Sequence, residues 1–128
     1  MSEYTDPKIT MAIDLKKYRL RVHRQTLKLL GSPEFIQLLI SPANNAIIIQ
    51  GRPERETGGQ EIPVTFDKPG PGGTFEIYSK ELISRIRKHF SGLDREGLYR
   101  LAGSYMAEEE CICFPLSTLS RAEETHDI

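Results

Sequence analysis

The 128-residue sequence lacks any apolar run approaching the ~20 residues that a membrane-spanning helix needs. Its first ten residues, MSEYTDPKIT, also lack the basic and apolar regions of a signal peptide. We therefore expect a cytoplasmic protein that makes no contact with membranes. The composition, 38% apolar and 27% charged, is ordinary for a soluble globular protein, and the length predicts one domain with one core.

Residues that serve as metal ligands or nucleophiles are scarce. Cys111 and Cys113 are the only cysteines, and their spacing in a predicted strand places both side chains on one face, where a disulfide between them is not expected. We interpret them as buried structural thiols. His23, His89 and His126 are scattered, and none completes a triad or a zinc site. The sequence thus predicts no enzyme, no cofactor, no metal and no small-molecule substrate.

Charge is unevenly distributed along the chain, although the net charge is only -1. Residues 15–30 contain six basic residues and no acid, whereas residues 108–127 contain six acids and one arginine. This asymmetry predicts one cationic surface and an acidic tail over residues 120–128.

The first half of the chain predicts the order strand, helix, hairpin. After a flexible N-terminus over residues 1–8, residues 9–13 alternate in polarity as an edge strand does. Residues 17–23 alternate strictly, with a cationic row on one face formed by Lys17, Arg19, Arg21 and His23. A helix over residues 25–30 ends at Gly31, and residues 35–40 and 46–50 form a hairpin.

Glycine, proline and charged residues dominate the segment between the two halves. Within it, residues 61–66 alternate as a strand, and Pro63 favours an edge position. We interpret residues 52–60 and 67–73 as loops because they are rich in glycine, proline and charged residues. Their glycines do not have the spacing of a phosphate-binding loop.

The second half repeats the order more clearly, with a strand over residues 75–78, a helix over residues 80–90 and a hairpin of residues 98–106 and 111–116. Ser79 is a good N-cap, and Glu81 and Arg85 have the spacing of an i, i+4 ion pair. One stripe of the helix is apolar, and Lys80, Arg87 and Lys88 lie outside it.

This order resembles one domain of a DNA sliding clamp. In particular, TFEIYSKELISRIRKHFSG and the later FPLSTL look like the strand, helix and closing motif of a bacterial clamp's N-terminal domain. The resemblance implies an α+β, clamp-like fold with two β-α-β-β(-β) repeats about a pseudo-twofold axis and two helices packed on antiparallel sheet. The single domain would span residues 9–119, with repeat one at 9–66 and repeat two at 74–119.

Clamp helices carry basic side chains that meet the DNA backbone. By resemblance, Arg24 and Lys28 on the first helix and Lys80, Arg87 and Lys88 on the second would bind duplex DNA without regard to sequence. Because clamp rings contain several such domains, the resemblance also implies a homo-oligomer.

A second resemblance covers residues 19–49, which are similar in spacing to the swapped-hairpin DNA-binding motif of bacterial transition-state regulators. Leu30 and Gly31 match its Leu-Gly pair, whereas His23 stands where that family has proline and its Gly-Asp is missing. Such a regulator would depend on Lys17, Arg19, Arg21 and Arg24. Three hypotheses therefore remain: a non-catalytic clamp-like protein on nucleic-acid backbone, a protein-interaction or structural module with the same fold, and a sequence-reading regulator.

Overall fold

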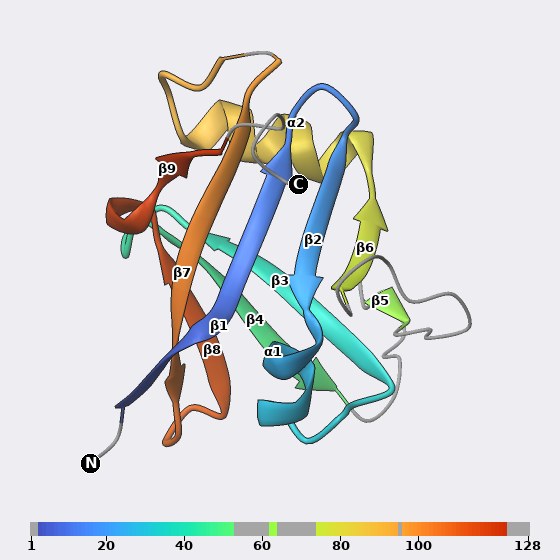
Figure 1. The fold of residues 1–128 in the computed structure, drawn as a ribbon, viewed down its shortest axis with the longest axis vertical. Helices are drawn as coiled ribbons and strands as arrows, with labels where there is room; N and C mark the ends of the chain where they lie inside the picture. The colour runs from blue at the N-terminus through green and yellow to red at the C-terminus, as the bar shows by residue number, and fades with distance from the viewer. Residues whose placement is uncertain (1–2, 53–61, 64–73, 95, 123–128) are drawn as a thin grey trace.

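The computed structural model describes residues 3–52, 62–63, 74–94 and 96–122. They form an α+β fold in which a curled antiparallel sheet carries two α-helices (Figure 1). The elements in chain order are β1 (Glu3–Asp14), β2 (Arg19–His23), α1 (Arg24–Leu29), β3 (Phe35–Ser41), β4 (Ala46–Arg52), β5 (Ile62–Pro63), β6 (Thr74–Tyr78), α2 (Lys80–His89), β7 (Leu98–Met106), β8 (Cys111–Pro115), the 3-10 helix η1 (Leu116–Thr118) and β9 (Ser120–Arg121).

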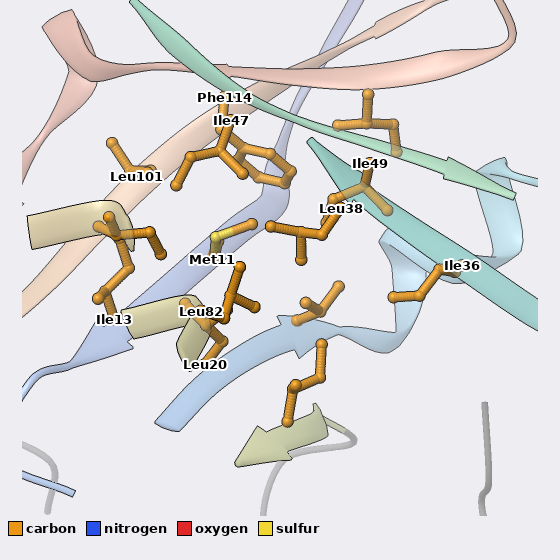
Figure 2. Packing of buried hydrophobic residues seen from close by; sticks show 14 of the residues in the cluster. Met11, Ile13, Leu20, Ile36, Leu38, Ile47, Ile49, Leu82, Leu101 and Phe114 are labelled. Atoms are coloured by element: carbon orange, nitrogen blue, oxygen red, sulfur yellow. The ribbon is translucent and has the colours of Figure 1, made fainter. Parts of the chain in front are cut away.

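The strands are ordered β5-β3-β4-β8-β7-β1-β2-β6 in the sheet, and β9 pairs with β7 outside this path. Because the sheet curls, β7, β1 and β2 cross in front of β3, β4 and β8 (Figure 1). The core fills the space between these two layers, where side chains from β1 and β2 meet those of β3, β4 and β8 (Figure 2). Its fully buried members include Met11, Ile13, Leu20, Ile36, Ile47, Ile49 and Phe114.

The prediction of an edge strand at residues 9–13 is wrong. β1 lies inside the sheet, with Met11 opposite Val22 of β2 on one side and Leu101 of β7 on the other. Ile9, Met11 and Ile13 are at most 1% exposed, so the alternation reports a core strand. β1 also begins at Glu3, within the segment expected to be a flexible terminus.

Both predicted hairpins and both predicted helices are confirmed, and each element begins and ends within two residues of its predicted bounds. The alternation of β2 is confirmed as well, since Leu20 and Val22 are buried while Arg19, Arg21 and His23 lie on the outer face. The hydroxyl of Ser79 caps α2 by accepting a hydrogen bond from Leu82 N at 3.1 Å. At the end of α1, Gly31 has φ +85°, the left-handed conformation that glycine adopts most easily.

The two helices lie at opposite ends of the curled sheet, α2 at the top and α1 at the bottom of Figure 1. α2 buries Leu82, Ile83 and Ile86 against the core, and α1 buries Leu27. β5 pairs only with β3 among the described strands, at the edge position expected from Pro63. Arg52, the first residue of the predicted loop 52–60, belongs to β4 instead. The rest of that loop, the predicted loop 67–73 and the end of the acidic tail at 123–128 lie outside the described residues.

Candidate nucleic-acid interface

The cationic row predicted over residues 17–23 is confirmed for Arg19, Arg21 and His23, whereas Lys17 lies in the turn before β2. Neighbouring strands compensate the charge of the two arginines. Arg19 Nη2 lies 3.0 Å from Asp14 Oδ2 on β1, and Arg19 Nη1 lies 3.6 Å from Glu76 Oε2 on β6. The same carboxylate oxygen accepts a 2.9 Å hydrogen bond from Arg21 Nε. The two arginines thus have two carboxylate partners, and neither lies within the basic run of residues 15–30. Asp14 directly precedes that run, and Glu76 lies on β6.

Arg19 is held in place rather than presented to solvent, because its side chain is only 11% exposed. Burial opposes its charged form, but a hydrogen bond with Tyr78 and the carboxylates of Asp14 and Glu76 outweigh that effect and raise the pKa of Arg19. The guanidinium is therefore a permanently charged structural group between β1, β2 and β6.

The turn between β1 and β2 brings Lys17 to the start of α2. Tyr18 O accepts a 3.0 Å hydrogen bond from Ser79 N, the cap residue of α2. The ammonium of Lys80 lies 5.5 Å from the centre of the Tyr18 ring, within the range of a cation–π contact. Lys16 and Lys17 are both exposed in this turn. The turn before β2 and the start of α2, which are far apart in sequence, therefore join at one end of the molecule.

The outward face of α2 carries most of the remaining positive charge. Lys80, Arg85 and Lys88 are exposed, and Arg87 is half-buried on the flank. Arg85, Arg87 and Lys88 form no ion pair with any residue that the structure describes, so the expected pair of Glu81 with Arg85 is not formed. We call the basic residues of the turn and the helix the α2 surface, consisting of Lys16, Lys17, Lys80, Arg85, Arg87 and Lys88.

Arg24 and Lys28 lie apart from the α2 surface. Both are on α1, at the opposite end of the curled sheet (Figure 1). Lys28 is exposed, while Arg24 is half-buried at the first position of the helix. The predicted residues therefore fall into three groups, which are the compensated pair Arg19 and Arg21 on β2, the α1 pair Arg24 and Lys28, and the α2 surface with Lys17, Lys80, Arg87 and Lys88.

Sequence reasoning missed two contributors. Arg85 was assigned to an ion pair, but its exposed side chain adds a cation to the α2 surface. Arg100 on β7 was not considered, yet it projects from the outer face of the sheet and is exposed. The alternation of Tyr99, Arg100 and Leu101 was the available signal, since it directs Arg100 away from the face on which Tyr99 and Leu101 are buried.

No cluster of three or more histidine, cysteine or acidic side chains suited to a metal ion is found among the described residues. Within the same part of the chain, neither helix has the length and apolar character required to cross a bilayer. Comparison with protein-family models, with curated proteins and with solved structures found no match to this chain.

Proposed function

We propose that this protein is a non-catalytic, clamp-like domain that binds the sugar–phosphate backbone of nucleic acid, with the α2 surface as its principal contact. The observation that carries the proposal is the charge of that surface. It presents six basic side chains and one acid, Glu81, and its three C-terminal cations are unpaired within the described chain. Mobile, uncompensated cations bind phosphates in any sequence context, because the contact is electrostatic.

The strand pairings support the clamp-like repeat. If β2-α1-β3-β4-β5 and β6-α2-β7-β8-β9 are equivalent units, the hairpin β3–β4 corresponds to β7–β8, and the pair β3–β5 corresponds to β7–β9. Of the four other contacts, two join equivalent strands in antiparallel fashion, as a twofold axis requires, namely β2 with β6 and β4 with β8. The other two pair β1 with β2 and with β7. Only β1 has no counterpart among the described strands.

Charge neutralisation in α2, compared with the same change in α1, tests the proposal. Three substitutions to glutamine, Arg85→Gln, Arg87→Gln and Lys88→Gln, remove exposed or half-exposed charges without touching the buried stripe. We expect the triple variant to lose at least about tenfold in affinity for a duplex in a fluorescence anisotropy titration at low salt. Lys28→Gln, at the far end of the molecule, is the control for Lys88→Gln alone, because each removes one exposed lysine charge, and it should change affinity little.

The same titration separates the hypotheses. If the wild-type protein does not bind duplex DNA at low salt, the backbone-binding proposal fails and so does the regulator. A regulator would prefer particular sequences and would depend on the β2 row, but Arg19 in that row is largely buried between Asp14 and Glu76, which is why we place the principal duplex contact at α2. Light scattering tests whether the protein forms a ring of several copies, because it measures the mass of the particle in solution. A measured mass of 14.5 kDa, that of one chain, would show a monomer, which cannot encircle DNA.

A protein-interaction module is the second candidate, and two exposed aromatic side chains favour it. Tyr18 is 37% exposed and Tyr78 is 64% exposed, and both lie beside the N-terminus of α2. Tyrosine supplies large contact area at low entropic cost in protein interfaces. If no nucleic acid is bound, this end of the molecule is the surface on which to seek a protein partner.

A further inference from the structure

A hollow of about 390 Å³ opens on the outer face of β7, β1, β2 and β6, and one of its lining residues, His23, is the N-cap of α1. Among the residues that the structure describes, its lining comes from all four strands and consists of Thr10, Ala12, Arg21, His23, Thr74 and Arg100. None of them is acidic, and three carry basic side chains. Its volume is within the range typical of small-molecule sites in proteins.

The register of the strands explains why the hollow forms. Arg100 on β7 lies opposite Ala12 on β1, which in turn lies opposite Arg21 on β2. Since neighbouring strands are about 4.8 Å apart, the two arginines stand about 10 Å apart with only a methyl group between them. Their long side chains can therefore both reach one anion bound above Ala12.

Both guanidinium groups have donors to spare. Arg21 uses its Nε for the 2.9 Å bond to Glu76, and its terminal Nη groups make no hydrogen bond to a described residue. Arg100 makes no hydrogen bond or ion pair with any residue in the described chain. Glu76 thus holds Arg21 through Nε, while the two Nη groups remain available as donors. Paired guanidinium N–H donors match the spacing of two phosphate oxygens.

His23 adds a donor whose tautomer follows from the fold. Its Nδ1 accepts a 3.0 Å hydrogen bond from Gln25 N and thereby caps α1. A neutral imidazole that accepts at Nδ1 carries its proton at Nε2, which is consequently a donor. Thr10 adds a hydroxyl group to the lining.

We propose that this hollow binds a phosphate group, with Arg21 and Arg100 as the ligating cations. The phosphate belongs either to a nucleic-acid backbone or to a small phosphorylated molecule, because the recognised chemistry is the same. The site is separate from the α2 surface and does not depend on the function proposed for that surface. Its volume exceeds what a phosphate alone requires, so it accommodates an attached sugar.

NMR titration of the arginine Nε–H and histidine side-chain signals tests the site. The probes are inorganic phosphate, ribose 5-phosphate and an eight-nucleotide oligothymidylate, added to the full-length protein at constant ionic strength. We expect saturable shifts at Arg21, Arg100 and His23. Stronger binding of ribose 5-phosphate than of the oligonucleotide identifies a small molecule as the ligand, and the reverse order identifies a nucleic-acid backbone. Absence of saturable shifts at these three residues with all three probes overturns the proposal.

Two variants make the result specific. Arg100→Gln, at an exposed position, should weaken binding about tenfold, the effect of losing one charge-assisted hydrogen-bonding group. Ala12→Val fills the floor of the hollow with a side chain that suits a strand and should also weaken binding. Lys28→Gln removes one positive charge from α1, outside the hollow, and should leave phosphate affinity unchanged. Equal losses for Lys28→Gln and Arg100→Gln would show diffuse charge attraction and contradict a built site. Loss of duplex binding in the α2 triple variant has no bearing on these shifts, so the two proposals can fail separately.

Discussion

Arg19 and Lys88 carry the same formal charge, but their surroundings give them different roles. Arg19 is 11% exposed and lies between Asp14 and Glu76, whereas Lys88 is exposed and has no ion pair within the described chain. A cation that already has two carboxylate partners gains little from a phosphate, because it must first give up those contacts. Compensation therefore determines which basic residues are available to a polyanion.

Glu76→Gln should destabilise the protein by about 1–2 kcal/mol, since its carboxylate accepts from Arg21 and faces the largely buried Arg19. Urea unfolding followed by circular dichroism measures this change. Glu96→Gln, in an exposed loop and without an ion pair to a described residue, is the control and should shift the midpoint little. Equal midpoints for the two variants would contradict a structural role for Glu76.

The interpretation of both cysteines as buried thiols is confirmed for Cys111 but not for Cys113, which is half-buried. Burial, followed by the charge of Glu109, raises the pKa of Cys111, and the side chain is buried. In a Cys113→Ser variant at pH 8, iodoacetamide should modify the native protein at least about tenfold more slowly than the urea-unfolded chain, because only the thiolate reacts.

The raised pKa of Cys111 makes the stability of the protein depend on pH. An unfolded cysteine loses its proton near pH 8.5 while the folded thiol keeps it. The contribution of Cys111 to stability is therefore complete below that pH and declines as the pH rises toward the folded-state pKa. Alkylation of native Cys113→Ser protein at the unfolded rate would show that Cys111 is accessible and would contradict this account.

The compensation of Arg21 could not be predicted from local sequence. Its partner Glu76 is 55 residues away and lies on β6, which pairs with β2 only in the folded sheet. Alternation correctly assigned Arg21 to the outer face, because the period of a strand fixes side-chain direction. Sequence patterns thus predicted the face of the sheet on which Arg21 lies, but not its ion-pair partner.

At the scale of elements, local sequence signals predicted the helices and hairpins, but they could not predict which strands lie next to each other in the sheet. The apolar stripe and the Ser79 cap predicted α2, and the hairpin β7–β8 was predicted around its acidic turn. β1 was misassigned to an edge because alternation describes one strand and carries no information on how many partners it has. The separation of α1 from α2 likewise follows from the curl of the whole sheet.

Ser79→Ala should destabilise the protein by about 1 kcal/mol through loss of the N-cap of α2. The same substitution at Ser84, which is exposed within the helix, removes a hydroxyl that caps nothing and slightly favours the helix. Thermal unfolding of both variants should therefore show a lower midpoint only for Ser79→Ala. A similar midpoint for the two variants would show that the cap contributes nothing.

At the scale of the whole molecule, the net charge of -1 does not describe the surface. The α2 surface concentrates six basic residues at one end, and the hollow on the sheet holds Arg21, His23 and Arg100 on another face. A neutral protein with separated charges can attract a polyanion locally while it remains soluble. The sequence predicted the excess of basic residues near the N-terminus, but only the fold joins Lys16 and Lys17 to α2.

The salt dependence of duplex binding tests the central claim most directly. Affinities of the wild-type protein and the Arg85→Gln, Arg87→Gln, Lys88→Gln triple variant are measured between 50 and 300 mM NaCl, on the order of physiological ionic strength, with two duplexes of unrelated sequence. We predict a linear fall of log affinity with log salt, equal for both duplexes, and a slope that is smaller by up to about 2.7 in the triple variant. No binding at the lowest salt, or the same slope in both proteins, would contradict the account.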